Sequence, residues 1–143
     1  MANILYDSAN TTVTINGRVF TDLAQGDAVK IEFPNEKSSK TKGINRSSVI
    51  KKRMDGNEAN VTVLVLKASA DDVFLNNILN QSELIILDGS IKTNFTRDGV
   101  AGVDSYALEN GTLVIHPEDT KNNVDGDEVM SYKINFVSAI RMI

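Results

Sequence analysis

Few residues of this chain have the chemistry that a catalytic or metal site needs. The 143 residues include no cysteine and one histidine, which excludes disulfides, cysteine nucleophiles and multi-histidine metal centres. That histidine, His116, precedes Pro117, but no serine stands in a Gly-x-Ser-x-Gly turn where it would serve as a nucleophile. No glycine-rich phosphate-binding motif occurs. We therefore expect a protein that is not an enzyme and that uses no cofactor.

An acidic stretch from Glu118 to Glu128 resembles a calcium-binding loop only in part. If Asp119 is taken as the first ligand, the twelfth position, where such a loop requires a bidentate glutamate, is Met130. Residues 123–127 suit a plain turn better. We expect no metal site.

Acidic and basic residues are separated along the chain. The net charge is −4, which disfavours the wrapping of duplex DNA. Eight acids and one lysine lie between Asp98 and Glu128. Two such segments can attract copies of the chain head to tail, or they can be solvated loops that keep the protein soluble. The basic segment has no acid among its seven basic residues, which are Lys37, Lys40, Lys42, Arg46, Lys51, Lys52 and Arg53.

The segment of about 36–53, which also holds Gly43, is predicted to be a long exposed loop, because it is polar and follows Pro34. Loops this long in a compact domain are usually functional or disordered. Three interpretations are open. The loop binds nucleic acid, although no aromatic residue lies between Phe33 and Phe74 to stack on a base. It is simply solvated. It docks on an acidic surface of a neighbouring copy, and this is the interpretation that we favour.

Alternation of apolar and polar residues predicts a mainly β chain. The alternation is clearest at 27–33, 58–67 and 128–137, and shorter strands are expected around 12–20, 84–96, 103–109 and 112–116. Asn16-Gly17 and Asn110-Gly111 suit hairpin turns, because both residue types tolerate positive φ. The length suits a single domain, 1–143, folded as a β-sandwich or partial barrel.

One flanking helix is expected over about 70–81. Ser69 suits the N-cap, and Asp71 and Asp72 lie in the first turn, where the helix dipole favours acids. We expect this helix to cover the strand at 58–67, whose end is apolar on both faces. Its own apolar stripe has i, i+4 spacing and consists of Phe74, Leu75, Ile78 and Leu79.

The order of these elements resembles the tail tube proteins of contractile-tailed bacteriophages, that is, myovirus-type inner tube subunits. The resemblance covers about residues 16–80, and beyond residue 88 the strand order still fits with a looser match. It is carried by an Asn-Gly opening, a Gly-Asp strand, a Lys/Ser-rich loop with a glycine, a valine-rich strand and a Ser-x-x-Asp-x-x-Leu helix start. These are residues 16–17, 26–32, 38–43, 55–66 and 69–75.

The resemblance implies a structural subunit that assembles into hexameric rings, which stack into a tube inside a contractile sheath. Sheets of neighbouring subunits would join into one barrel around the channel through which DNA passes, without specific binding. The loop at 36–53 would reach a neighbouring subunit or ring. The partners implied are other copies of the chain, together with the tail sheath, baseplate and tail terminator proteins. The protein would lie in the virion, and in the host cytoplasm during assembly.

Strands that line a tube should alternate between an apolar core and a water-filled lumen. On this ground Lys30, Glu32, Lys133 and Asn135 are predicted to face the lumen. Two alternatives are kept. One is the tube subunit of a related secretion or injection system, such as a type VI secretion system. The other is a β-sandwich module that binds a ligand or carbohydrate; such a module needs exposed aromatic residues, and the eight aromatics here are expected mostly at core positions.

Overall fold

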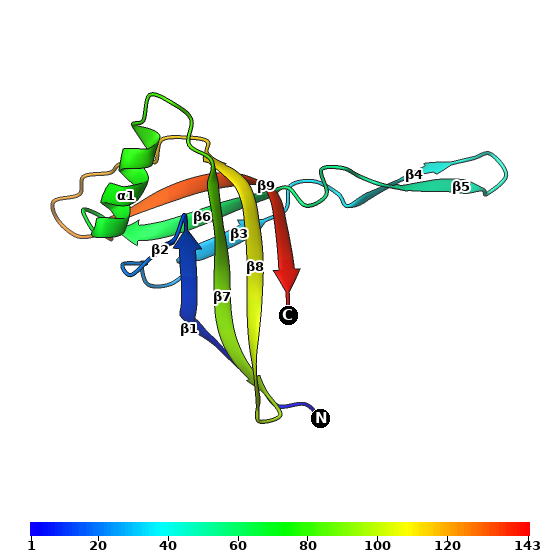
Figure 1. Ribbon diagram of the computed structural model, residues 1–143, viewed down its shortest axis with the longest axis horizontal. Helices are drawn as coiled ribbons and strands as arrows, with labels where there is room; N and C mark the ends of the chain where they lie inside the picture. The colour runs from blue at the N-terminus through cyan, green and yellow to red at the C-terminus, as the bar shows by residue number, and fades with distance from the viewer.

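The computed structural model describes all 143 residues, which form two antiparallel sheets and one helix (Figure 1). The larger sheet has seven strands in the order β2-β1-β7-β8-β9-β6-β3, and β4 and β5 form a separate hairpin. The strands are β1 (Ile4–Ile15), β2 (Arg18–Val19), β3 (Val29–Glu32), β4 (Ser38–Lys42), β5 (Ser48–Lys52), β6 (Ala59–Leu66), β7 (Leu87–Arg97), β8 (Val100–Leu113) and β9 (Val129–Met142), and the helix is α1 (Ala70–Leu79).

The seven-stranded sheet curls until its two ends nearly meet. The chain between β2 and β3 crosses from one end of the sheet to the other. There Leu23 forms a bridge with Val65, and the Ala24 amide donates to the Leu64 carbonyl at 2.9 Å. The sheet does not close completely, so the prediction of a mainly β, partly closed barrel with one flanking helix is confirmed.

A single hydrophobic core fills the inside of the curl. The valines of β6 predicted to lie on one face, Val61, Val63 and Val65, are fully buried. They meet Ile134 and Phe136 of the neighbouring strand β9, and Val13 and Ile15 approach from the opposite end of the sheet. The second face of β6 is less covered than expected, because Leu66 is 46% exposed.

Helix α1 closes one end of the curled sheet (Figure 1). Its predicted N-cap is confirmed, since the Ser69 hydroxyl accepts the Asp72 amide at 3.3 Å. Asp71 is fully buried and holds the helix to the chain around β2. Its carboxylate accepts from Arg18 Nη2 at 2.9 Å and from the amides of Thr21 and Asp22 at 2.9 and 2.7 Å. The helix therefore contributes both Leu75 and a buried carboxylate to the inside of the sheet.

The two Asn-Gly pairs have different structures. Asn16-Gly17 forms the predicted turn between β1 and β2, with φ values of 50° and 81°. The predicted turn at Asn110-Gly111 is wrong, because β8 runs through it as one strand to Leu113. The hairpin instead turns at Asp98-Gly99, with φ values of 50° and 80°. Gly111 packs against the ring of Phe136, so a Cβ at this position would clash with the ring.

A substitution at Gly89 tests the close approach of β7 to β1. A Cβ at this position would fall against the Thr14 carbonyl oxygen, which is backbone and cannot rotate away. We expect Gly89→Ala to lower the free energy of unfolding by about 1–3 kcal/mol, as overpacking does. Urea denaturation measures this loss. Lys92→Ala, at an exposed position of the same strand, is the control and should change stability by less than about 0.5 kcal/mol.

Candidate assembly surfaces

The side of the sheet opposite the core is largely polar, although Leu64, Val103 and Ile140 also lie on it. On each strand its residues alternate with core residues, so that Lys92 stands between the buried Ile91 and Thr93. Strand pairing places these residues beside one another across the sheet. We call the polar face the set Thr12, Thr14, Lys30, Glu32, Asn60, Thr62, Ser90, Lys92, Asn94, Thr112, Ser131, Lys133 and Asn135.

The structure brings together the four residues that were predicted to face a lumen. Lys30 pairs with Thr62, which pairs with Lys133. In the adjoining row, Glu32 and Asn135 pair with Asn60 from opposite sides. All four therefore lie on the polar face, in two neighbouring rows at its β3 end. That this face lines a lumen stays a prediction.

Asn135 has a second contact, which the alternation did not indicate. Its Nδ2 donates to Glu58 Oε1 at 3.0 Å and to Asn60 Oδ1 at 2.8 Å. Glu58 also accepts from Asn35 Nδ2 at 2.7 Å. Asn35 and Glu58 stand on the two chain segments that lead to and from the hairpin β4–β5. This amide–carboxylate network therefore fixes the base of the hairpin to the sheet.

The segment predicted to be a long exposed loop, 36–53, is exposed as expected, and residues 38–52 within it form two paired strands. The segment forms a hairpin that projects away from the sheet along the longest axis of the molecule (Figure 1). The predicted Gly43 lies at its turn, where its amide donates to the Ser47 carbonyl at 2.7 Å and an added Cβ would press on the Ser47 hydroxyl. We call β4, β5 and their turn, residues 38–52, the basic hairpin.

The basic residues of this segment do not all point the same way. Antiparallel pairing sets Ser38 opposite Lys52, Lys40 opposite Ile50 and Lys42 opposite Ser48. Lys40, Lys42 and Lys52 therefore share one face of the basic hairpin, while Lys51 lies on the other. Arg46 stands in the turn with φ 67°. The remaining two predicted residues, Lys37 and Arg53, lie at the hairpin's base.

Arg53 differs from the other six predicted basic residues because it is paired within the chain. Its Nε and Nη2 each donate to the Asp55 carboxylate at 3.0 Å. The guanidinium lowers the pKa of Asp55 through these hydrogen bonds. Arg53 is therefore a structural residue of the hairpin's base, and the free positive charge lies further out.

Two edges of the large sheet have no partner strand. β2 pairs with β1 only at Thr14 and Ile15, so the edge of β1 is unpaired from Ile4 to Thr12. β6 pairs with β9 only as far as Phe136, so beyond it the edge of β9 makes one hydrogen bond, from the Ala139 amide to Asn57. β1, β7, β8 and β9 extend beyond the rest of the sheet (Figure 1). Sequence reasoning missed these edges, because an unpaired edge has no signature in residue type.

A buried carboxylate joins three of the four extended strands, and a hydroxyl pair joins the fourth. Asp104 on β8 is 5% exposed and accepts both Nε and Nη2 of Arg141 on β9, at 2.9 Å each. It also accepts the Tyr6 hydroxyl of β1 at 2.9 Å. Across β7, which lies between β1 and β8, Thr93 bonds to Thr11 at 2.9 Å. This cluster gives the extended strands a fixed shape where the hydrophobic core no longer reaches.

The cluster shifts the pKa values of its members. Arg141, and to a lesser degree Tyr6, hold the pKa of Asp104 below its ordinary value despite burial. Burial and the neighbouring carboxylate raise the pKa of Tyr6. Asp104 is thus charged and Tyr6 protonated over the whole neutral range.

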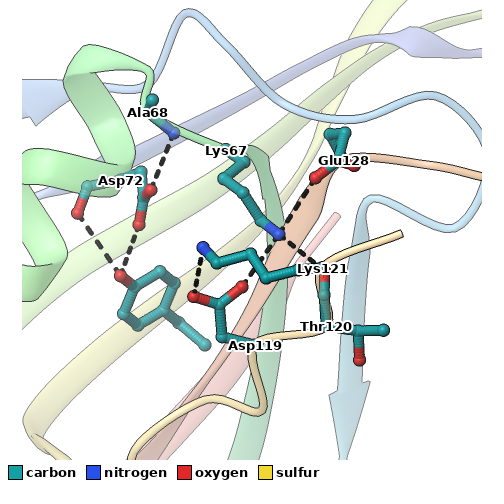
Figure 2. A network of polar contacts seen from close by, with 8 residues as sticks. Lys67, Ala68, Asp72, Asp119, Thr120, Lys121 and Glu128 are labelled. Atoms are coloured by element: carbon teal, nitrogen blue, oxygen red, sulfur yellow. Dashed lines mark hydrogen bonds and ion pairs between the residues drawn. The ribbon is translucent and has the colours of Figure 1, made fainter. Parts of the chain in front are cut away.

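The acidic loop, residues 118–128, is fastened to the sheet by one lysine (Figure 2). Lys67 Nζ lies 2.8 Å from Asp119 Oδ1, 3.0 Å from Glu128 Oε2 and 2.9 Å from the Thr120 carbonyl. These partners, Asp119 first, raise the pKa of Lys67, and Lys67 in turn lowers the pKa of Asp119. Beside them Tyr132 donates its hydroxyl to Asp72 of α1. The loop is therefore held at the same end of the molecule as the helix.

The inner side of the extended strands is hollow and carries aromatic residues. An open cavity of about 840 Å³ is lined by Tyr6, Thr93, Asp104 and Tyr106, among others. The ring of Phe33 lies 6.5 Å from that of Tyr106, and Tyr6 and Phe33 are 50% and 42% exposed. Tyr6 and Phe33 are therefore exceptions to the expectation that the aromatics lie mostly in the core, whereas Tyr106 packs against it.

His116, the one histidine, lies apart from these surfaces. His116 is exposed in the segment after β8. No group of three His, Asp or Glu side chains has an arrangement that would hold a metal ion. No helix is long and apolar enough to span a membrane.

Comparison with solved structures finds a protein of the same architecture. Hcp1 from Flavobacterium johnsoniae superposes with a TM-score of 0.50 at 15% sequence identity, over 92% of this chain and 93% of Hcp1. The chain has the Hcp1 fold. No protein-family model and no curated protein sequence matches it. Since the identity to Hcp1 is low, this likeness concerns the fold alone.

Replacement of Asp104 tests the cluster through pH. Because its pKa is lowered by folding, the stability that it contributes is complete above the unfolded value of about 4 and is lost as pH falls through the lower folded value. We expect Asp104→Asn to be less stable at pH 7 and to lose less stability than the original chain between about pH 4 and pH 2. Urea denaturation across this range measures both effects. Asp125→Asn, which removes an exposed carboxylate of the acidic loop that makes no ion pair, is the control for the substitution itself.

Proposed function

We propose that this chain is the subunit of a self-assembled tube, of the kind found in contractile phage tails and in related injection systems. The observation that carries the proposal is a pair of unpaired strand edges, on β1 and on β9, in a sheet whose outer side is largely polar. The Hcp1 fold supports the same class of protein. The sequence resemblance over about residues 16–80 favours the phage tail among the members of this class.

The two unpaired edges give the subunit a means to form a ring. An exposed edge is an open template for strand pairing, and closure into a barrel removes it. The edge of β1 and the edge of β9 lie on opposite sides of the four extended strands, so β1 of one copy can pair with β9 of the next. Pairing of this kind would satisfy both of these edges around the ring. The resemblance implies six copies per ring.

In such a ring the polar face lines the channel. Its charged side chains are of both signs: Lys30 and Lys133 lie near Glu32 at the β3 end, and Lys92 lies on β7, with hydroxyl and amide groups between. A face of this kind is wetted by water and has no continuous positive strip to hold phosphates. It suits a channel through which DNA passes without being bound. We propose a structural and not a catalytic role, in the virion, with sheath, baseplate and terminator proteins as the further partners.

Two other assignments are compatible with parts of the structure. A tube subunit of a secretion system would need the same fold, edges and polar face, and it differs in the cargo that passes. A ligand- or carbohydrate-binding module is favoured by one observation, the half-exposed Tyr6 in the lining of the open cavity. A binding module stays a small discrete species in solution, whereas a tube subunit does not.

Negative-stain electron microscopy of the purified protein, at low and high concentration, separates these classes. We expect rings or hollow tubes whose abundance rises with concentration. Discrete small particles at all concentrations, together with binding to a carbohydrate array, would instead support the binding module and overturn the tube.

The absence of cysteine allows a direct test of the lumen. Lys133→Cys places a single thiol on the polar face, and Asn77→Cys places one on exposed α1 as the matched control. In assembled tubes we expect a bulky polyethylene-glycol maleimide to label position 77 but not position 133, because the channel excludes it. Unassembled protein should be labelled at both. Equal labelling of position 133 in both states would show that the polar face lies outside the tube.

A further inference from the structure

The basic hairpin and the acidic loop lie at opposite ends of one strand. β6 begins at Ala59, just after the hairpin's base, and ends at Leu66, beside Lys67 and the end of the acidic loop, where the Lys67 amide donates to the Glu128 carbonyl at 3.0 Å. Eight residues of β-strand span about 25 Å. The hairpin then projects further away (Figure 1). The two segments of one chain therefore cannot reach each other.

Both segments carry charge that the chain itself does not neutralise. Lys40, Lys42 and Lys52 crowd one face of the basic hairpin, and no acid occurs from Lys37 to Arg53. In the acidic loop Asp119 and Glu128 pair with Lys67, but the other three acids make no ion pair. These three are Glu118, Asp125 and Asp127, and all are exposed.

Each segment also exposes a large apolar side chain. Ile44 in the turn of the hairpin is 99% exposed, and Val124 in the acidic loop is 87% exposed. An apolar residue surrounded by charges is the composition of a contact with a buried centre and a polar rim. A two-stranded hairpin is in addition only marginally stable when it stands alone in water. Contact with another surface would stabilise it.

We propose that the Lys40–Lys42–Lys52 face of the basic hairpin docks on the acidic loop of a second copy, against Glu118, Asp125 and Asp127. The inference rests on the proposed function, because it names the partner surface of the hairpin within the assembly. Since the two surfaces differ and lie at opposite ends of the molecule, the contact is heterologous and repeats from copy to copy. It gives the assembly a direction.

Charge reversal in two variants tests the pairing. The hairpin variant carries Lys40→Glu, Lys42→Glu and Lys52→Glu, and both of its docking surfaces are then acidic. The loop variant carries Glu118→Lys, Asp125→Lys and Asp127→Lys, and both of its surfaces are basic. We expect each variant alone to need an at least about tenfold higher concentration to associate, because like charges face each other. An equimolar mixture should associate as the original chain does, with the two variants alternating.

Sedimentation velocity measures this association and does not require that tubes form. If the mixture sediments as the sum of its two components, the docking proposal is overturned, whatever electron microscopy shows of the original chain. If the mixture associates but the original chain forms no ring or tube at any concentration, the docking stands and the proposed function fails. Circular dichroism of each variant verifies that the fold is unchanged.

A matched pair of single variants tests the face of the hairpin. Lys52→Glu and Lys51→Glu are adjacent in sequence and alter the same charge, but the two side chains lie on opposite faces of β5. We expect Lys52→Glu to raise the concentration needed for association several-fold more than Lys51→Glu does. Equal effects would mean that net charge, and not this face, governs association, and would overturn the assignment.

Discussion

The backbone hydrogen bonds of the sheet edges are the constraint on which the rest of this structure depends. The N–H and C=O groups of a strand need hydrogen-bond partners, and an exposed edge strand is a template for pairing with a strand of another chain. At the helix end the chain solves this internally, because the segment around Leu23 joins one end of the curled sheet to β6. Along the extended part of β1 and β9 no such segment exists. The backbone groups of the sheet edge are therefore paired in the half near the helix and unpaired in the extended half.

The two halves are stabilised by different interactions. Near α1, burial of Val63, Ile134 and Leu75 removes apolar surface from water, which is the usual source of stability. In the extended half the inner side is hollow, and Asp104 with Arg141 and Tyr6 replaces the missing core by directional hydrogen bonds. Such bonds fix geometry more than they add stability. Fixed geometry is what β1 of one copy needs if it is to pair in register with β9 of the next.

Much of the fold was predictable because burial imposes alternation. The strands at 27–33, 58–67 and 128–137 and the helix after Ser69 all carry one buried face, and periodicity detects a buried face. The first half of β1, Ile4–Asn10, is exposed throughout and so left no pattern. The basic hairpin was missed for the same reason. At Asn110-Gly111 and Asp98-Gly99 the residue types alike permit a turn, and only the pairing of β7 with β8 decides between them.

The features of the candidate assembly surfaces also fall into those that a buried or charged pattern predicts and those that only strand pairing reveals. Residue type and alternation were enough to place Lys30, Glu32, Lys133 and Asn135 on one face, and charge counting was enough to find the basic and acidic segments. Neither could reveal that strand pairing stops at Phe136 on β9, or that β6 holds the two charged segments apart. These are facts of topology. Yet they bear on the role of the charges, because opposite charges that cannot meet within one chain are left free to meet between chains. Both this contact and the pairing of β1 with β9 join unlike surfaces, and such a contact closes into a ring where the rotation between copies closes and otherwise repeats as a filament.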